Sequence, residues 1–347
     1  MTTDGASGPA TVAALAVDGG ASKTDVLALA ADGSVLAWAR GAGSNHQFSG
    51  LEEAMEVIGA TVAVVRRSAG IGDATVATGL FCLAGVDLPV DEQRVGDAVA
   101  GRGWSTDAVV RNDTFAVWRA GSTRAWGVGV VCGSGLNCVG VGPDGTTVRF
   151  PSLAELSGDF AAGGSWLGMR TLGLALRAND GRGRPTVLTD LVPAHFGLGS
   201  PEVVLESVYE GTLPYHRLFE LAQVCLDAAA AGDAEARRAV AYLADEVVAM
   251  AGAAVDRLGV GDRDVEVVVG GGVFETSHPE FADRVEAGLR RHAPDLVLRR
   301  LESPPVVGAG LLALDALGSG PAAWDRLRAD VAGRGPVSVG STEEPPT

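Results

Sequence analysis

The chain has 347 residues, of which 47% are hydrophobic and only 5% are aromatic, so it can bury a sizeable core of alanine, valine and leucine. Its 27 basic and 43 acidic residues leave a net charge of −16, and so acidic a surface repels phosphate backbones and excludes general nucleic-acid binding. The 49 glycines follow no three-residue period, which excludes collagen.

The cysteines and the N-terminus indicate the compartment. No two of the four cysteines have CxxC spacing, so the sequence predicts neither a zinc site nor a disulfide framework. The first ten residues contain no basic segment followed by an apolar one, so no signal peptide is expected. No run of about 18 apolar residues occurs, so no membrane span is expected either. The sequence therefore predicts a cytoplasmic protein with no membrane partner.

The predicted elements of the first part are a meander followed by alternating helices and strands. Residues 1–10 are expected to form a disordered tail. Glycine turns separate the first three strands, which predicts antiparallel pairing. The expected elements are strands at 12–17, 25–30 and 34–39, a helix at 50–68, a strand at 75–83, a helix at 91–101 and a strand at 107–112.

The same pattern starts again near residue 127, with a glycine turn and an Asp–Gly turn in matching places. The expected strands are 127–132, 136–142, 146–150, 265–269 and 296–300, and the expected helices are 164–179, 185–197, 201–210, 214–230, 233–258, 279–291 and 305–317. A repeat of about 110 residues predicts two related domains that face each other. Chance similarity between glycine turns is the alternative, and residues 333–347 are expected to form a second disordered tail.

The first glycine turn joins two strands and has the composition of a phosphate-binding loop. Gly19 and Gly20 allow backbone N–H groups to approach an anion without obstruction by a Cβ atom. Asp18, at the end of the first strand, could hold Mg²⁺ through water. Lys23, the only lysine of the chain, and Thr24 could reach a phosphate oxygen. An ordinary hairpin turn is the alternative.

Two further glycine segments occupy corresponding places in the second half. Gly133, Ser134 and Gly135 lie where the first turn lies in the first half, so a pair of such turns could grip a polyphosphate. Gly271 and Gly272 follow a Val-rich strand and leave a flat surface on which a nucleoside could rest. A tight strand-to-helix turn is the alternative for the second segment.

Polar residues at strand ends and in loops are candidates for catalysis and sugar binding. Asp113 follows a strand and could accept a proton from a hydroxyl group that attacks a phosphoryl group, although an N-cap would have the same sequence. Asn45, His46, Asn137 and Asp159 have the donors and acceptors that bind sugar hydroxyls. Each of these four is more commonly a turn or cap residue.

The order of these motifs resembles the BadF/BadG/BcrA/BcrD ATPase family and, within it, the N-acetylglucosamine kinases. The resemblance covers roughly residues 12–318. It rests on DGGASKT (18–24), GSNH (43–46), RNDT (111–114), GSGLNC (133–138), LSGD (156–159), VVVGGGVF (267–274) and PPVVGAGLLAL (304–314).

The resemblance implies an α/β protein with two actin-like ATPase domains, of the RNase H-like type, and a nucleotide cleft between them. The N-terminal domain would comprise residues 11–121 together with a returning helix at 305–318. The C-terminal domain would comprise residues 122–304 and contain helical insertions. The implied activity is transfer of the γ-phosphate of ATP to the 6-hydroxyl of an amino sugar, in the first place N-acetylglucosamine.

The resemblance also assigns the residues. Asp113 would be the general base, and Asp18 would hold Mg²⁺ through water. The phosphates and nucleoside of ATP would contact Gly19, Gly20, Lys23, Thr24, Gly133, Ser134, Gly135, Gly271 and Gly272. The sugar would contact Asn45, His46, Asn137 and Asp159. ATP and Mg²⁺ are thus the implied cofactors, and a homodimer is possible by analogy with relatives.

One departure leaves the sugar open. Relatives often carry Gly-Gly-Trp-Gly shortly before the sugar-binding Gly-Asp, whereas this chain has Pro151 to Ser157 with no such segment. Glucosamine and N-acetylmuramic acid are therefore alternative substrates. A dehydratase activator that bridges an iron–sulfur cluster through cysteines is a second enzymatic alternative. A sugar- or nucleotide-binding sensor without turnover is the non-enzymatic one.

Overall fold

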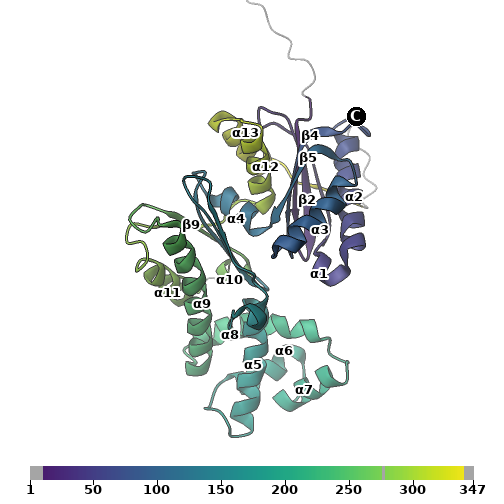
Figure 1. Cartoon of the computed structure of the whole chain (residues 1–347). Coiled ribbons are helices and arrows are strands. Elements are labelled where there is room, and N and C mark those ends of the chain that lie inside the picture. The colour runs from purple at the N-terminus through teal and green to yellow at the C-terminus, as the bar shows by residue number, and fades with distance from the viewer. Residues whose placement is uncertain (1–10, 276–277, 340–347) are drawn as a thin grey trace, which may run out of the picture. The chain divides into compact units, whose positions relative to one another are not determined.

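The computed structural model describes residues 11–275 and 278–339 of the chain (Figure 1). The described residues form two compact units, one of residues 11–123 with 301–339 and one of residues 124–300, and each is described by itself. The expected tail at residues 1–10 lies outside the described residues. Residues 340–347 of the second expected tail also lie outside them.

A mixed sheet forms the centre of the first unit. β1, β2 and β3 pair antiparallel, and β4 and β5 continue the sheet parallel to β1, in the order β11-β3-β2-β1-β4-β5. The strands are β1 (Ala14–Gly19), β2 (Lys23–Leu29), β3 (Val35–Ala42), β4 (Val76–Leu83), β5 (Ser105–Asn112) and β11 (Val337–Ser338). Almost all residues of β1 and β2 are buried because helices cover both faces of the sheet.

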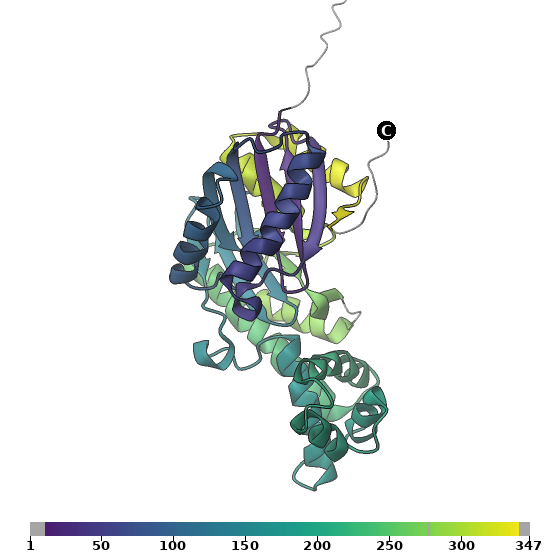
Figure 2. The same ribbon diagram turned by 90° about the vertical axis from the view of Figure 1, so that its right-hand side faces the viewer.

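Helices cover the two faces of this sheet. α2 packs on β2 and β3 and α3 on β5, whereas α12 packs on β1, β2 and β4 (Figure 1). Figure 2 shows α2, in dark purple, lying across the strands. The helices are α1 (His46–Ser49), α2 (Leu51–Ser68), α3 (Pro89–Ala100), α4 (Thr114–Gly121), α12 (Pro305–Ala316) and α13 (Pro321–Ala332).

The second unit repeats the strand order of the first. Its sheet runs β10-β9-β6-β7-β8, which matches β5-β4-β1-β2-β3, and its antiparallel and parallel pairs fall in the same places. The strands are β6 (Gly127–Cys132), β7 (Leu136–Val141), β8 (Thr147–Arg149), β9 (Glu266–Gly270) and β10 (Val297–Arg300). The repeat predicted from the turns is therefore present in the topology.

A helical segment is inserted between β8 and β9 of the second unit. α9 packs on β6, β7 and β8, and α5, α8 and α11 pack on α9. The inserted helices are α5 (Gly164–Asn179), α6 (Leu188–Phe196), α7 (Pro201–Tyr209), α8 (Leu221–Ala230) and α9 (Ala234–Leu258), with 3₁₀ turns at Ala154–Ser157 and Tyr215–Glu220. α10 (Gly272–Glu275) and α11 (Pro279–Leu289) follow β9. Within the described ranges, every helix is too short or too polar to cross a membrane.

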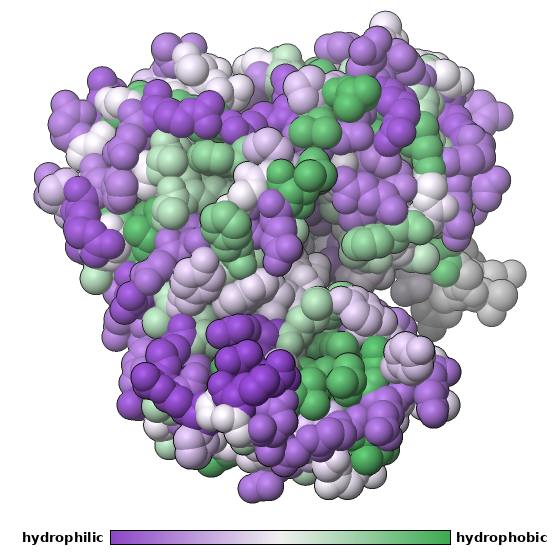
Figure 3. All heavy atoms as spheres, turned by 60° about the horizontal axis from the view of Figure 1, so that its bottom comes forward, coloured by the Kyte–Doolittle hydropathy of each residue, from purple (hydrophilic) through white to green (hydrophobic). Residues whose placement is uncertain are grey.

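Exposed hydrophobic side chains concentrate on the inserted segment. The face drawn in Figure 3 is mostly hydrophilic, with hydrophobic residues gathered in small groups. Most of the large exposed hydrophobic side chains lie between residues 156 and 242, among them Leu156, Phe160, Met169, Leu205 and Tyr209. Three of these five, Leu156, Phe160 and Met169, lie beside the sugar-binding Gly-Asp predicted from the sequence.

The C-terminal part of the first unit differs from the prediction. The expected disordered tail began at residue 333, but Val337–Ser338 form β11, which pairs parallel with β3 at the edge of the sheet. Because two residues make too short a strand for a periodic pattern, the sequence does not reveal β11. α13 was not predicted either, although its buried residues Ala323, Leu327 and Val331 recur at the four-residue spacing of a helix.

Glycine lets α12 lie against α4. A Cβ atom on Gly308 of α12 would lie 1.8 Å from the carbonyl oxygen of Ala116 in α4, closer than any real contact. Buried Arg119 of α4 then forms an ion pair with Asp315 of α12, with Nε 2.9 Å from Oδ2. Because α4 begins directly after Asp113, this packing fixes the position of the predicted base.

We expect Gly308→Ala to lower the stability by about 2 kcal/mol, because the added methyl group must push α12 away from α4. Thermal unfolding measures the loss. The matched control is Gly96→Ala in α3, where a Cβ atom would meet nothing within 4 Å. That substitution should stabilise the helix by about 0.5–1 kcal/mol. Equal midpoints for the two variants would contradict the close packing.

Candidate functional site

The carboxyl ends of three parallel strands meet at one edge of the first sheet. Gly19 of β1 pairs with Leu83 of β4, and Leu83 pairs with Asn112 of β5. Asp18 and Asp113 therefore lie at this edge, where ligands bind in open α/β sheets.

Asp18 is a buried carboxylate whose negative neighbours outweigh its positive ones. Its side chain is 6% exposed. Burial raises the pKa of Asp18 to about 8, Asp113 and Asp25 add to the rise, and Lys23 and Arg40 oppose it. A cation bound at this carboxylate would relieve the repulsion. The oxygen donor fits a hard ion such as Mg²⁺, but no group of three or more His, Cys, Asp or Glu side chains in the described residues could hold a metal.

Asp113 occupies the N-cap position of α4, as the alternative interpretation assumed, but its side chain does not cap the helix. The backbone N–H of Thr114 donates to Oδ1 of Asn112 at 2.9 Å, and the Asp113 side chain forms no capping hydrogen bond. Burial raises the pKa of Asp113 to about 7, and Asp87 adds to the rise, while backbone N–H groups at Thr114 and Asp113 oppose it. The carboxylate is thus free to act as a base and titrates near neutral pH.

The first glycine turn is held closed by backbone hydrogen bonds. The Gly20 N–H donates to the Lys23 carbonyl at 2.8 Å, and the Ser44 N–H donates to the Gly20 carbonyl at 2.9 Å. A Cβ atom on Gly19 would lie 2.5 Å from Oγ of Ser44. A side chain at residue 19 would therefore have to displace the Ser44 hydroxyl and the Leu83 side chain.

The structure corrects the role expected for Thr24. Thr24 is fully buried, and its Oγ1 lies 2.7 Å from the Ala42 carbonyl and 2.8 Å from Oγ of Ser44. Its hydroxyl therefore ties β2 to the end of β3 and does not face a ligand.

Lys23 precedes Thr24 on β2, and its side chain points to the other face of the strand. That side chain is 42% exposed, with Nζ 3.8 Å from Oδ2 of Asp25. Lys23 is available to a phosphate.

His46 also differs from the prediction, whereas Asn45 remains at the surface of its loop. Oδ1 of Asn45 accepts a hydrogen bond from the Gln47 N–H at 2.9 Å and caps α1. His46 is buried, and its Nε2 lies 3.8 Å from Oδ1 of Asp91, beyond hydrogen-bonding distance. Burial lowers the pKa of His46. His46 therefore packs the loop against α3 and does not reach out to a sugar.

Two residues of this edge were missed by the sequence analysis. Asp87 follows β4 and accepts hydrogen bonds from Nδ2 of Asn112 at 2.9 Å and from Nε2 of Gln47 at 3.0 Å. The available signal was the segment Ala84-Gly85-Val86-Asp87, which places a glycine and a carboxylate at a strand end, as in the first turn. Gln47 gave no signal because a surface glutamine is common in loops.

In the second unit, the glycine turn meets the start of α5. The Gly133 N–H donates to the Gly135 carbonyl at 2.9 Å. The turn carbonyls of Gly133 and Ser134 accept hydrogen bonds from the N–H groups of Gly164 and Ser165, at 2.8 and 3.0 Å. Gly133, Ser134 and Gly135 therefore form an ordered turn, and its contacts with α5 were not predicted.

Gly271 lies against the same turn. Its φ of +95° favours glycine, and a Cβ atom there would lie 2.6 Å from the carbonyl carbon of Cys132. Gly272 is exposed and begins α10. Asn137 lies on β7 beyond the turn, where its Oδ1 accepts a hydrogen bond from the Cys138 N–H at 2.7 Å. The structure thus brings the two predicted phosphate and nucleoside segments of this unit, residues 133–135 and 271–272, together.

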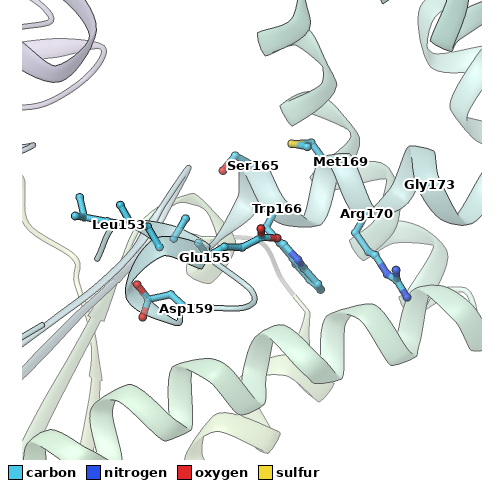
Figure 4. Close-up of a pocket in the computed structure, with 11 residues that line it drawn as sticks. Leu153, Glu155, Asp159, Ser165, Trp166, Met169, Arg170 and Gly173 are labelled. Atoms are coloured by element: carbon cyan, nitrogen blue, oxygen red, sulfur yellow. The ribbon is translucent and has the colours of Figure 1, made fainter. Parts of the chain in front are cut away.

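Asp159 lines a pocket of about 620 Å³ in the second unit. Figure 4 shows the pocket between the loop of Leu153 to Asp159 and the exposed side of α5, with Trp166 and Met169 among the side chains from the helix. Oγ of Ser157 donates to Oδ2 of Asp159 and holds the carboxylate in the loop. Ser152 and Ala154 have φ values of 50° and 53°, which are unusual for residues other than glycine.

The four cysteines are all buried. Cys132 and Cys138 lie on neighbouring strands inside the core of the second unit, and burial raises the pKa of Cys132 to about 12. They act as small hydrophobic side chains, as the sequence predicted. A cluster bridged between subunits needs accessible thiolates, so these positions do not favour the dehydratase-activator alternative.

Comparison with known proteins gives one family and several relatives. The model of the BadF/BadG/BcrA/BcrD ATPase family matches residues 15–313. An N-acetylmuramic acid/N-acetylglucosamine kinase of Clostridium acetobutylicum is 24% identical over 230 residues, 66% of this chain and 74% of the relative. An N-acetyl-D-glucosamine kinase of Dictyostelium discoideum is 24% identical over 247 residues, 70% of this chain and 77% of the relative.

Solved structures share the fold. A candidate N-acetylglucosamine kinase of Chromobacterium violaceum is 25% identical and superposes with a TM-score of 0.67, covering 86% of this chain and 98% of that one. A hexokinase of Schistosoma mansoni with bound glucose is 15% identical, with a TM-score of 0.54, and covers 87% and 84%. With the two related sheets, this likeness confirms the expected α/β, actin-like ATPase fold class.

We expect Asp18→Asn to stabilise the protein in the absence of ligands, and more at pH 8 than at pH 5. A carboxyl pKa raised from 3.8 to about 8 means that the folded state keeps a proton that the unfolded state has lost. Stability therefore falls as pH rises through this range, and asparagine removes the loss. Thermal unfolding at both pH values measures it. Exposed Asp73→Asn is the control, and a gain that is equal at both pH values would contradict the assignment.

Proposed function

Because the chain belongs to the BadF/BadG/BcrA/BcrD ATPase family, we propose that it is an ATP-dependent sugar kinase that phosphorylates the 6-hydroxyl of an amino sugar. The observation that carries the proposal is Asp113, an uncapped carboxylate at the strand edge beside Asp18. The names of the similar kinases favour N-acetylglucosamine as the substrate. ATP use follows from the family.

In the proposed reaction, the Asp113 carboxylate accepts the proton of the 6-hydroxyl as its oxygen attacks the γ-phosphorus. The bond between that phosphorus and the β,γ-bridging oxygen breaks, and ADP leaves with the electron pair. Lys23 and the turn at Gly19 and Gly20 would contact phosphate oxygens from the first unit. Gly133, Ser134 and Gly135 would do so from the second unit, and Gly271 and Gly272 would lie under the nucleoside.

Mg²⁺ would be held mainly by phosphate oxygens and water, with Asp18 as the nearest carboxylate of the first unit. A magnesium ion neutralises charge on the phosphates when it is bound. Asp18 would hold the ion through its water ligands.

The sugar is proposed to contact Asn45 of the first unit and Asn137 and Asp159 of the second. The pocket beside Asp159 has room for a substituent, and Leu153, Leu156 and Trp166 give it an apolar lining. These apolar side chains would suit the methyl group of an N-acetyl substituent, whereas Glu155 and Asp159 in the same lining would suit the ammonium group of glucosamine. N-acetylmuramic acid, with its additional lactyl group, is the second candidate substrate, and a homodimer is proposed by analogy alone.

The direct test is ADP release from Mg·ATP with each of three sugars: N-acetylglucosamine, glucosamine and N-acetylmuramic acid. We expect kcat/KM to be highest for N-acetylglucosamine. Ligand-dependent thermal stabilisation without ADP release would favour the binding-sensor alternative and contradict the kinase proposal.

We expect Asp113→Asn to lower kcat by about 10² to 10⁴-fold while sugar binding, measured by calorimetry, remains. The wild-type kcat/KM should rise with pH up to about 7, because below this pKa the Asp113 carboxyl of the free enzyme is protonated and cannot accept the proton of the sugar hydroxyl. Above pH 7 the rate should level off. Normal turnover by Asp113→Ala would remove Asp113 from the role of base.

Lys23 offers a test that needs no substitution, since it carries the only ε-amino group of the chain. We expect an amine-selective reagent such as acetic anhydride to modify Lys23, and Mg·ATP to protect it by at least about tenfold because the ammonium contacts a phosphate. Mass spectrometry of the Lys23 peptide measures the protection, and the N-terminal amine is the internal control. Equal labelling with and without ATP would argue against the phosphate contact.

A further inference from the structure

The carboxylate of Asp87 bonds two segments that are far apart in the sequence. Its Oδ1 accepts a hydrogen bond from Nδ2 of Asn112, at 2.9 Å, and its Oδ2 accepts one from Nε2 of Gln47, at 3.0 Å. Asn112 ends β5, directly before the proposed base, and Gln47 lies in α1, directly after the loop of the proposed sugar contact Asn45. Both segments belong to the first unit.

On one side, Asp87 orients Asn112, and Asn112 orients the start of α4. The Asn112 amide uses both ends: Nδ2 donates to Asp87, and Oδ1 accepts from the Thr114 N–H at 2.9 Å. Asn112 is buried, with 4% of its surface exposed, so these bonds are made with little competition from water. Asp113 lies between the two bonded residues, and its backbone is fixed from both sides.

On the other side, Asp87 holds the sugar loop through Gln47. Nε2 of Gln47 donates to the Gly85 carbonyl as well, at 3.0 Å, and the Gln47 N–H donates to Oδ1 of Asn45 at 2.9 Å. Gly85 has φ +83°, and a Cβ atom there would lie 2.6 Å from Oδ1 of Asn45. The segment that carries Asp87 is therefore pressed against the sugar loop, and a side chain at residue 85 would separate them.

We propose that Asp87 is a positioning residue. Its hydrogen bonds join the sugar-contacting loop to the segment that carries the base, and so they fix the position of the sugar's 6-hydroxyl relative to the Asp113 carboxylate. The inference rests on the proposed function, because it needs Asp113 to act as the base and Asn45 to contact the sugar. Beyond that function, it assigns the alignment of the base with the sugar contact to the hydrogen bonds among Asn112, Asp87 and Gln47. Asp87 itself need not touch the substrate.

The experiment compares steady-state kinetics of Asp87→Ala, Gln47→Leu and the double variant. Asp87→Ala should lower kcat about 10- to 100-fold and raise the sugar KM several-fold, because both branches are lost. Gln47→Leu should mainly raise the sugar KM. The sugar KM of the double variant should rise by less than the product of the two single effects, because both substitutions remove the Asp87–Gln47 hydrogen bond and only Gln47→Leu also removes the one to Gly85. The KM for ATP should change less than about twofold in all three.

Two further variants separate positioning from general damage. Asp87→Asn keeps one acceptor oxygen for two donors and should fall between the wild type and Asp87→Ala in kcat. Asp107→Asn, an exposed carboxylate on β5, should match the wild type. A parallel change in kcat, both KM values and the thermal midpoint would reduce Asp87 to a structural role and overturn the inference.

If Asp87→Ala raised the sugar KM but left kcat unchanged, Asp87 would be a direct sugar contact and not a positioning residue. That result would overturn the inference as well. ADP release by the wild type tests the proposed function separately from these comparisons. Its absence with every amino sugar would overturn both.

Discussion

The first unit depends on holding two carboxylates, Asp18 and Asp113, at one edge of a sheet with little positive charge to balance them. Burial raises the pKa of Asp18 to about 8 and that of Asp113 to about 7; repulsion from Asp113 adds to the first rise and repulsion from Asp87 to the second. Such an arrangement costs folding stability and persists because the surrounding structure over-determines it. The nearest balanced carboxylate, Asp25, shows the contrast: Arg40 binds both its oxygens, at 2.8 Å each. Within the described residues, Asp18 and Asp113 lack such a partner, and a cation bound with the ligand could neutralise their charge.

Helix packing away from the two carboxylates fixes the position of Asp113. α4 begins after Asp113, and its position is fixed by α12 at Gly308 and by the ion pair of Arg119 with Asp315. The guanidinium of Arg119 also lies 4.6 Å from the ring centroid of Trp324 in α13, a cation–π contact. The base is therefore positioned by two means, helix packing behind it and the Asn112 hydrogen bonds beside it.

The sequence was sufficient for most of the framework because glycine turns and buried strand runs repeat in both halves. α5 and β6 begin and end where they were predicted. The side chains were harder to place, because the residue type does not reveal which way a side chain points. Thr24 and His46 have suitable polar groups but are buried. Asp87 gives only the signal of a glycine and a carboxylate after a strand, and its role emerges when Asn112 and Gln47 converge on it in space.

The last elements of the first unit, α13 and β11, lie beyond residue 313, where the match to the family ends. They are nevertheless attached to parts that matter for the base. Arg328 of α13 donates to the Ala120 and Ser122 carbonyls, at 2.5 and 3.0 Å, and so satisfies acceptors at the end of α4. Oδ2 of Asp330 accepts from the Val35 N–H of β3 at 2.9 Å. A segment that joins the far end of α4 to the edge of the sheet limits how α4 can tilt, and thereby how Asp113, at its other end, can move.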